Sequence, residues 1–257
     1  MNLLFDTHAH YDDPQFDEDR DALLASLPEN GVGLVLIPGC DLATSRKALA
    51  LAEQYPFVYA AVGCHPEDCA SFRDEDIAEY REMAKHPKVV AIGEIGLDYY
   101  WEQNPTREVQ MHALREQLKL ALELDLPVII HDRDAHADCY DLVREFKGLR
   151  GVFHCYSSSF EFAKPLLKMG WYLGFDGPLT FKNARRSVEV AEQVPLDRVL
   201  LETDSPTLAP EPMRGTRNDS TKLHFVAEKF AALRNMDVDE VIRITNENGR
   251  RLFGIAE

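Results

Sequence analysis

Eight short apolar segments, each followed by a helical pattern, constrain the fold of this chain more than any other feature of its sequence. The expected strands cover residues 3–7, 33–37, 57–62, 88–93, 127–131, 151–154, 171–175 and 198–202. The expected helices cover residues 16–27, 43–54, 75–85, 106–124, 136–147, 159–169, 182–193, 218–234 and 238–253. Several strands are apolar throughout, as strands buried on both faces are. This alternation predicts parallel β/α units.

Eight such units fit an α/β fold of the (β/α)8 TIM-like barrel type, although an open doubly wound sheet shows the same alternation. A barrel of this kind typically needs roughly 250 residues in one domain, and the chain has 257. No linker, low-complexity tract or strong repeat divides the sequence. We therefore expect a single barrel domain over residues 1–257.

The composition favours a cytoplasmic globular protein. A hydrophobic fraction of 45% excludes a disordered chain, and no apolar stretch approaches the ~20 residues of a membrane helix. No secretory signal is visible, and the five cysteines are odd in number without C-x-x-C spacing, which indicates reduced thiols. The net charge of −16 argues against a broad nucleic-acid-binding surface, but it permits a nucleic-acid substrate at a local cationic site.

Histidines and acidic residues gather at the carboxyl ends of the expected strands, just past the strand or as its last residue. They are His8, His10, Glu94, His131, His154 and Asp204. In a barrel, these strand ends form the face that carries the active site. His8 and His10 are two residues apart on an extended segment, so they point to one face and can share a metal ion. We interpret all six residues as metal ligands.

Other residues near the strand ends have different interpretations. His65 and Arg133 are expected to contact substrate, and Arg217 is expected either to contact phosphate or to be solvated. Cys64 and Cys155 are interpreted as buried thiols rather than nucleophiles. A further group of histidines lies in or beside helices and is interpreted as surface or structural: His86, His112, His136 and His224. Tight turns explain the glycines at strand ends: Gly93, Gly96, Gly174 and Gly177.

The expected charge of the site points to an anionic substrate. Two divalent ions bring a charge of +4, and the carboxylates of Glu94 and Asp204 reduce it to about +2 before hydroxide binds. The chain lacks the G-x-S-x-G elbow of serine hydrolases and the G-x-x-x-x-G-K-[ST] phosphate loop. A phosphate ester held by two metal ions therefore fits better than a covalent serine mechanism.

Six ordered motifs resemble those of the TatD family of metal-dependent deoxyribonucleases, within the amidohydrolase-like barrels. They are Asp6-Thr7-His8-Ala9-His10, Gly63-Cys64-His65-Pro66, Gly93-Glu94-Ile95-Gly96-Leu97-Asp98-Tyr99, Pro127-Val128-Ile129-Ile130-His131, His154-Cys155-Tyr156-Ser157 and Leu201-Glu202-Thr203-Asp204-Ser205-Pro206. The C-terminal Asn248-Gly249-Arg250-Arg251-Leu252-Phe253 also resembles the family's ending. The resemblance spans nearly the whole chain.

The resemblance implies a division of labour among the six ligands. His8, His10, Glu94 and Asp204 would hold one ion, and Glu94 would bridge to a second ion that His131 and His154 also hold. Asp204 would orient or deprotonate the attacking water. Two positions depart from the family's pattern, Ser158 and the segment Asp219-Ser220. We expect both to lie in loops that touch substrate.

The leading hypothesis is therefore a hydrolase of DNA phosphodiester bonds. It would act as a 3′ to 5′ exonuclease on single-stranded ends, through hydroxide activated by two divalent cations. Zinc, manganese, iron or nickel suits these ligands, and magnesium suits them less well. One alternative is a metal-dependent hydrolase of an amide, lactone or other ester bond; another is a non-catalytic barrel that binds nucleic acid or a protein partner. We expect a monomer or small oligomer and no membrane association.

Overall fold

The structure is a computed structural model that describes residues 2–256. It groups into two compact parts. Unit 1 contains residues 2–37, 155–251 and 255–256, and unit 2 contains Pro38–His154 and Leu252–Gly254. No helix within the described range is long and apolar enough to cross a membrane.

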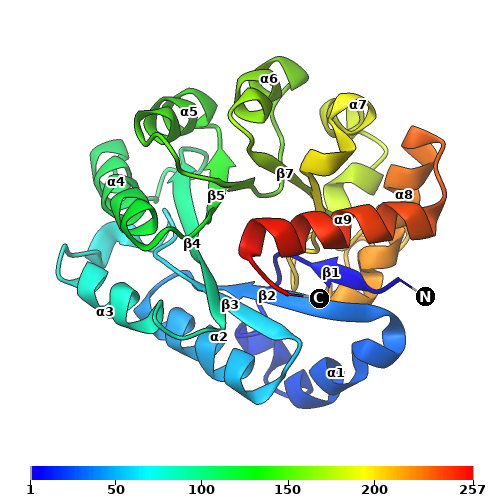
Figure 1. The fold of residues 1–257 in the computed structure, drawn as a ribbon, viewed down its shortest axis with the longest axis horizontal. Helices are drawn as coiled ribbons and strands as arrows, with labels where there is room; N and C mark the ends of the chain where they lie inside the picture. The colour runs from blue at the N-terminus through cyan, green and yellow to red at the C-terminus, as the bar shows by residue number, and fades with distance from the viewer. Residues whose placement is uncertain (1, 257) are drawn as a thin grey trace. The chain divides into compact units, whose positions relative to one another are not determined.

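Unit 1 contains both ends of the described chain (Figure 1). Its strands and helices are β1 (Leu4–Asp6), α1 (Arg20–Ser26), β2 (Val32–Pro38, whose last residue belongs to unit 2), α6 (Phe160–Lys168), β7 (Tyr172–Phe175), α7 (Arg185–Gln193), β8 (Val199–Leu201), α8 (Leu223–Arg234) and α9 (Val238–Phe253, whose last two residues belong to unit 2). β1 pairs in parallel with β2, and β7 pairs in parallel with β8. A parallel bridge between Ala9 and Ser205 joins the segments that follow β1 and β8.

Unit 2 is an uninterrupted β/α alternation (Figure 1). Its elements are α2 (Leu42–Gln54), β3 (Val58–Val62), α3 (Asp76–Met83), β4 (Val89–Asp98), α4 (Arg107–Leu124), β5 (Val128–Arg133), α5 (His136–Glu145) and β6 (Gly151–Phe153). Parallel pairing runs from β3 to β4, from β4 to β5 and from β5 to β6. The strand interiors are buried, as the uninterrupted apolar runs predict.

The strand order confirms the predicted (β/α)8 class. Neighbouring strands follow the sequence from β1 to β8 in one eight-stranded sheet. A doubly wound sheet reverses its strand order at a switch point, and this order contains no reversal. The expectation of a single domain stays a prediction.

The main departure from the expected elements is strand β4, which continues to Asp98 instead of ending near residue 93. Glu94 therefore lies inside a strand, beside a register irregularity between Ile92 and Ile95, and does not follow the strand as expected. The turn interpretation of Gly93 and Gly96 is wrong for the same reason. A Cβ at Gly93 would lie 2.7 Å from Ile129 Cβ, and one at Gly96 would collide with the His131 carbonyl.

Of the remaining two glycines, Gly174 also falls outside the turn interpretation, whereas Gly177 does lie in a tight turn, closed by the hydrogen bond from Leu179 N to Asp176 O at 3.0 Å. Gly174 lies inside β7, where a Cβ would collide with the carboxylate of Glu202. Gly177 begins a short 3-10 helix, where a Cβ would collide with the carbonyl of Leu208. All four residues are glycine because a neighbouring group approaches the backbone too closely for a side chain.

Helix α4 fixes the ends of two strands through two buried glutamines. Gln117 accepts a hydrogen bond from Cys64 N at 2.7 Å and donates to Cys64 O at 3.1 Å, just past β3. Gln110 does the same for Asp98 at the end of β4, with distances of 2.8 and 2.9 Å. The two glutamines are seven positions apart, about two helical turns, so both amides point to the same face of the helix. The helix therefore positions the backbone at two carboxyl ends.

Replacing Gln117 with alanine tests this support. The substitution leaves the buried amide and carbonyl of Cys64 without their partner, so we expect the free energy of unfolding to fall by about 2–4 kcal/mol. Urea denaturation measures the change. Gln193→Ala is the matched control, because Gln193 also donates to a carbonyl four residues earlier but is exposed. Equal midpoints for the two variants would contradict a supporting role for Gln117.

Candidate metal centre

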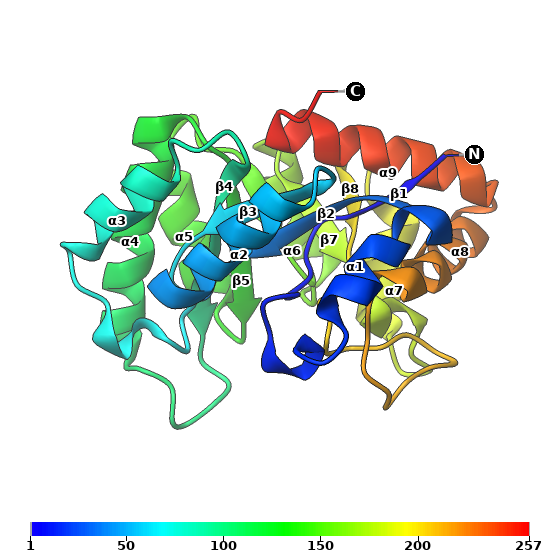
Figure 2. The same ribbon diagram turned by 90° about the horizontal axis from the view of Figure 1, so that it is seen from below.

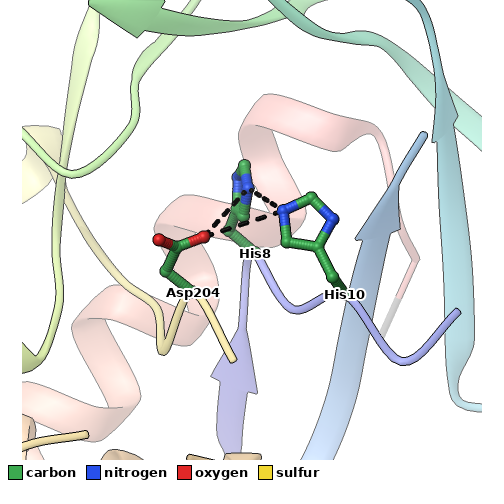
Figure 3. Close-up of side chains that lie close together, drawn as sticks. All are labelled: His8, His10 and Asp204. Atoms are coloured by element: carbon green, nitrogen blue, oxygen red, sulfur yellow. Dashed lines mark hydrogen bonds and ion pairs between the residues drawn. The ribbon is translucent and has the colours of Figure 1, made fainter. Parts of the chain in front are cut away.

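A first cluster of ligand-type atoms lies in unit 1 and consists of His8, His10 and Asp204 (Figure 3). The Nε2 atoms of His8 and His10 are 3.1 Å apart. Oδ1 of Asp204 lies 3.6 Å from Nε2 of His8 and 3.7 Å from Nε2 of His10. His8 is fully buried, and the other two side chains are about one-fifth exposed. The three side chains point toward one another, as the sequence predicts.

The spacing of this cluster fits a divalent transition-metal ion. Ligand atoms that sit about 2.1 Å from a metal in tetrahedral or octahedral geometry are roughly 3.0–3.4 Å from one another. The three observed distances of 3.1, 3.6 and 3.7 Å are close to that range. Two neutral imidazoles and a carboxylate are also the donors that zinc and manganese accept.

The backbone brings these three residues together from the two ends of unit 1. Asp204 N donates to His8 O at 2.9 Å, and His10 N donates to Ser205 O at 2.7 Å. Asp204 has a φ of 54°, a left-handed conformation that aspartate tolerates better than most residues. Its side chain also accepts a hydrogen bond from the Thr207 hydroxyl at 3.2 Å.

Asp6 supports this cluster through hydrogen bonds to the residues next to it. Its carboxylate accepts hydrogen bonds from the amide and hydroxyl of Thr203 at 3.0 and 2.6 Å, and from the Ser220 hydroxyl at 2.6 Å. The amide of His8 donates to it at 3.3 Å. Burial raises the pKa of Asp6 to about 7, against these hydrogen bonds, which lower it. Asp6 therefore ties the end of β1 to the segment that follows β8.

A second cluster lies in unit 2, around one carboxylate oxygen of Glu94. Oε1 is 3.0 Å from Nδ1 of His131, 3.3 Å from Nε2 of His154 and 3.5 Å from Nε2 of His65. Glu94 and His154 are almost fully buried, and the other two side chains are less than one-fifth exposed. These distances also match the separation of ligand atoms around one metal ion.

Asp98 contacts the other side of the His131 ring. Its Oδ2 lies 3.0 Å from Nε2 of His131, and its Oδ1 accepts the Tyr100 amide at 2.9 Å. Burial lowers the pKa of His131, but the hydrogen bonds to Asp98 and Glu94 outweigh burial and raise it to about 9. Metal-binding histidines commonly donate their second N–H to such a carboxylate. The pair therefore orients Nδ1 of His131 toward Glu94.

The structure brings all six expected ligands into one or the other cluster. It also brings His65 within the range of a metal ligand in unit 2, although the sequence favours a substrate contact for this residue. Arg133 lies at the end of β5, two residues beyond His131. The roles of these residues, and the expected bridging by Glu94, stay predictions.

Several residues near the strand ends have structural partners. Arg217 pairs with both carboxylate oxygens of Asp19, at 2.8 and 2.5 Å. Burial raises the pKa of the Cys64 and Cys155 thiols, so neither is a thiolate at neutral pH. The histidines assigned to the surface contact Glu53, Asp74, Asp132 and the Thr221 carbonyl.

The two departures from the family pattern carry buried side chains. Ser220 is fully buried between Asp6 and the Tyr11 hydroxyl, which donates to it at 2.8 Å. Ser158 is also buried. The buried side chains of Ser158 and Ser220 do not face solvent, and the expectation that the loops around them touch substrate stays a prediction.

Sequence reasoning assigned no role to Asp6, Asp98 or Glu202. Glu202 accepts the Cys155 amide at 2.6 Å and the Thr7 hydroxyl at 3.3 Å, next to two of the ligand positions. All three acids lie in the motifs quoted above. An acid two residues before a ligand at a strand end, as Asp6 is before His8 and Glu202 before Asp204, is the sequence signal that could have identified two of them.

A (β/α)8 barrel with histidine–carboxylate clusters at the carboxyl ends of its strands is an architecture of metal-dependent hydrolases. Comparison with known proteins agrees. The family model described as TatD related DNase matches residues 5–254. The chain belongs to the TatD family of metal-dependent hydrolases.

Individual relatives match over almost their full length. The chain is 43% identical to the metal-dependent hydrolase YabD of Bacillus subtilis, over 98% of this chain and 100% of that protein. It is 36% identical to the 3′-5′ ssDNA/RNA exonuclease TatD of Cronobacter sakazakii, over 97% of each chain. The crystal structure of YjjV, a TatD homologue from Escherichia coli, superposes with a TM-score of 0.92 at 33% identity, covering 98% of each chain.

Replacing Asp98 with asparagine tests its support of His131. Asparagine keeps an acceptor for the Tyr100 amide but removes the negative charge beside the imidazole, so metal affinity is expected to fall about 10-fold or more. Calorimetric titration of the metal-free protein with Mn²⁺ or Zn²⁺ measures the affinity. Asp132→Asn is the control, because Asp132 contacts His136 instead, at 2.7 Å. Unchanged binding by Asp98→Asn would contradict the assigned role.

Proposed function

We propose that this protein hydrolyses phosphodiester bonds of DNA and removes nucleotides from single-stranded 3′ ends. The main structural support is the pair of clusters, each with a carboxylate and at least two imidazoles at the spacing of metal ligands. The relatives named as 3′-5′ ssDNA/RNA exonucleases support this substrate class. DNA is the proposed partner.

We assign one divalent cation to each cluster. His8, His10 and Asp204 would hold the first, and Glu94, His131 and His154 would hold the second. When bound, such cations lower the pKa of a water molecule and polarise a phosphoryl oxygen. Zinc or manganese suits the imidazole-rich donor set better than magnesium.

The protein's own residues would handle proton transfer and orientation. Asp204 is about one-fifth exposed, so its carboxylate can accept the proton of an attacking water. Asp6 and the backbone hydrogen bonds to His8 and Ser205 hold Asp204 in place. His65, beside Glu94, and Arg133, at the end of β5, are proposed to contact the phosphate backbone of the substrate. Asp98 would keep the ring of His131 in the ligating orientation.

Removing the metal and removing the proton acceptor should each abolish nuclease activity. Chelator is expected to stop cleavage of a single-stranded oligonucleotide, and added Mn²⁺ or Zn²⁺ should restore it. Asp204→Asn should lower kcat by about 10²- to 10⁴-fold, since both a ligand and a general base are lost. Gel-based rate measurements on highly purified protein provide the values. Activity that survives both treatments would contradict this mechanism.

Asp125→Asn is the matched control for Asp204→Asn. Asp125 has a φ of 53°, close to the 54° of Asp204, but it lies at the end of α4 and pairs with Arg150. The same chemical change in the same backbone conformation should therefore leave kcat unchanged. A comparable loss in Asp125→Asn would attribute the defect to folding.

Product mapping tests the polarity and the class of bond. A single strand labelled at its 5′ end should give a ladder that shortens one nucleotide at a time from the 3′ end. Parallel assays with small amides and lactones test the alternative bond, because the same activated water can attack a carbonyl carbon. Faster turnover of an amide or lactone than of DNA would contradict this proposal and favour the alternative hydrolase.

A further inference from the structure

Two aromatic side chains face solvent on the loop that leaves strand β4. Tyr100 is 50% exposed and Trp101 is 42% exposed. Their ring centroids are 4.6 Å apart, with an angle of 85° between the rings. The guanidinium of Arg133 lies 3.9 Å from the centroid of Tyr100 and 5.2 Å from that of Trp101. Large apolar groups gathered at one exposed place mark a binding surface more often than isolated ones do.

The loop that carries these rings is anchored at its base. Tyr99 N donates to Arg133 O at 2.9 Å, and Asn104 N donates to Trp101 O at 3.1 Å. The loop projects beyond the helices of unit 2 (Figure 2). The rings are therefore presented to solvent on a backbone with defined hydrogen bonds.

One carboxylate connects this loop to the second metal cluster. Oδ1 of Asp98 accepts the amide of Tyr100 at 2.9 Å, while its Oδ2 lies 3.0 Å from Nε2 of His131. Arg133 is two residues from His131 on β5, so both side chains point to the same face of the strand. A molecule resting on the aromatic rings would therefore lie on a loop that Asp98 connects to the second cluster.

We propose that Tyr100, Trp101 and Arg133 form a stacking platform for a nucleobase of a single-stranded nucleic acid. This inference rests on the proposed function and names the part of the substrate that this loop would bind. Every base has a π face, so stacking on aromatic rings tolerates any sequence. Arg133 adds a cation beside the rings, which favours both a base and the phosphate attached to it.

The platform also gives a physical reason for a preference for single strands. In a duplex, each base is covered on both faces by its neighbours, so stacking on a protein ring requires that the base first leave the helix. A single strand presents its bases without that cost. The platform therefore selects frayed or single-stranded substrate without reading the base edges.

Tryptophan fluorescence tests contact with the platform directly. The chain has two tryptophans; Trp101 is exposed and Trp171 is fully buried. Adding oligothymidylate to the Asp204→Asn protein, which is expected not to cleave it, should quench the emission, and the quenching should disappear in the additional variant Trp101→Phe. Quenching that persists in Trp101→Phe, or that never occurs, would overturn the proposal.

Kinetics with strands that lack bases test whether stacking contributes to binding. Trp101→Ala should raise KM for a normal single strand about 10-fold and leave kcat within about two-fold. Replacing the bases near the 3′ end with abasic sites should raise KM for the wild type by a similar factor. It should not raise KM further for Trp101→Ala. If Trp101→Ala raised KM equally for the normal and the abasic strand, or for neither strand, the result would contradict stacking.

Two variants separate stacking from a general effect on the fold. Trp101→Phe keeps an aromatic face and should restore KM to within about three-fold of the wild type. Tyr140→Ala is the matched control, because Tyr140 also carries an arginine over its ring, Arg144 at 5.4 Å, but lies on helix α5. It should leave KM unchanged. A KM in Tyr140→Ala raised as much as in Trp101→Ala would count against the platform.

The two proposals fail in different ways. If the protein binds oligothymidylate but cleaves no nucleic acid, the proposed function fails, and the fluorescence experiment still decides the platform. If the protein cleaves single strands and Trp101→Ala has the KM of the wild type, the platform alone fails.

Discussion

The buried carboxylate of Glu94 determines how the side chains of the second cluster must be arranged. A carboxylate removed from water is costly unless it has partners, and three imidazoles lie within 3.0–3.5 Å of its Oε1. The hydrogen bonds from His131 to Glu94 and Asp98 raise the pKa of the imidazole, so the buried carboxylates favour its protonated form. A divalent cation would replace that proton. Like Glu94, the carboxylate of Asp98 stabilises a positive charge on His131, but it contacts the other ring nitrogen, Nε2.

Unit 1 also contains a buried carboxylate, that of Asp6, and stabilises it with hydrogen bonds from amides and hydroxyls in place of imidazoles. Asp6 is fully buried, and amides and hydroxyls from two distant parts of the sequence donate to its two oxygens. The amide of His8 follows β1, and the donors of Thr203 follow β8, so satisfying the acid also aligns His8 with Asp204. The Ser220 hydroxyl, just before α8, completes the set. Glu202 repeats the principle beside Cys155 and Thr7, in space left by the absence of a side chain at Gly174.

Local pattern was sufficient to predict most of the fold, because apolar runs and helical periodicity report burial directly. It was also sufficient to identify the ligand candidates, since parallel strands bring their carboxyl ends to one face. It misplaced Glu94 relative to strand β4, because glycines that permit close strand contact resemble a turn. It failed for Gln110 and Gln117, because a polar residue on a helix is normally solvated. Their partners are 12 and 53 residues away, and only the folded chain shows them.

The two hydrogen bonds from the Gln110 amide to the backbone have a consequence for how enzymes of this family diversify. Its amide nitrogen donates to the carbonyls of Asp98 and Pro105, which closes the β4–α4 loop at its base. The residues between these two points can therefore be exchanged without moving the strand that carries Glu94. Relatives could acquire new substrate ranges through point changes in this loop while inheriting their hydrolytic machinery intact.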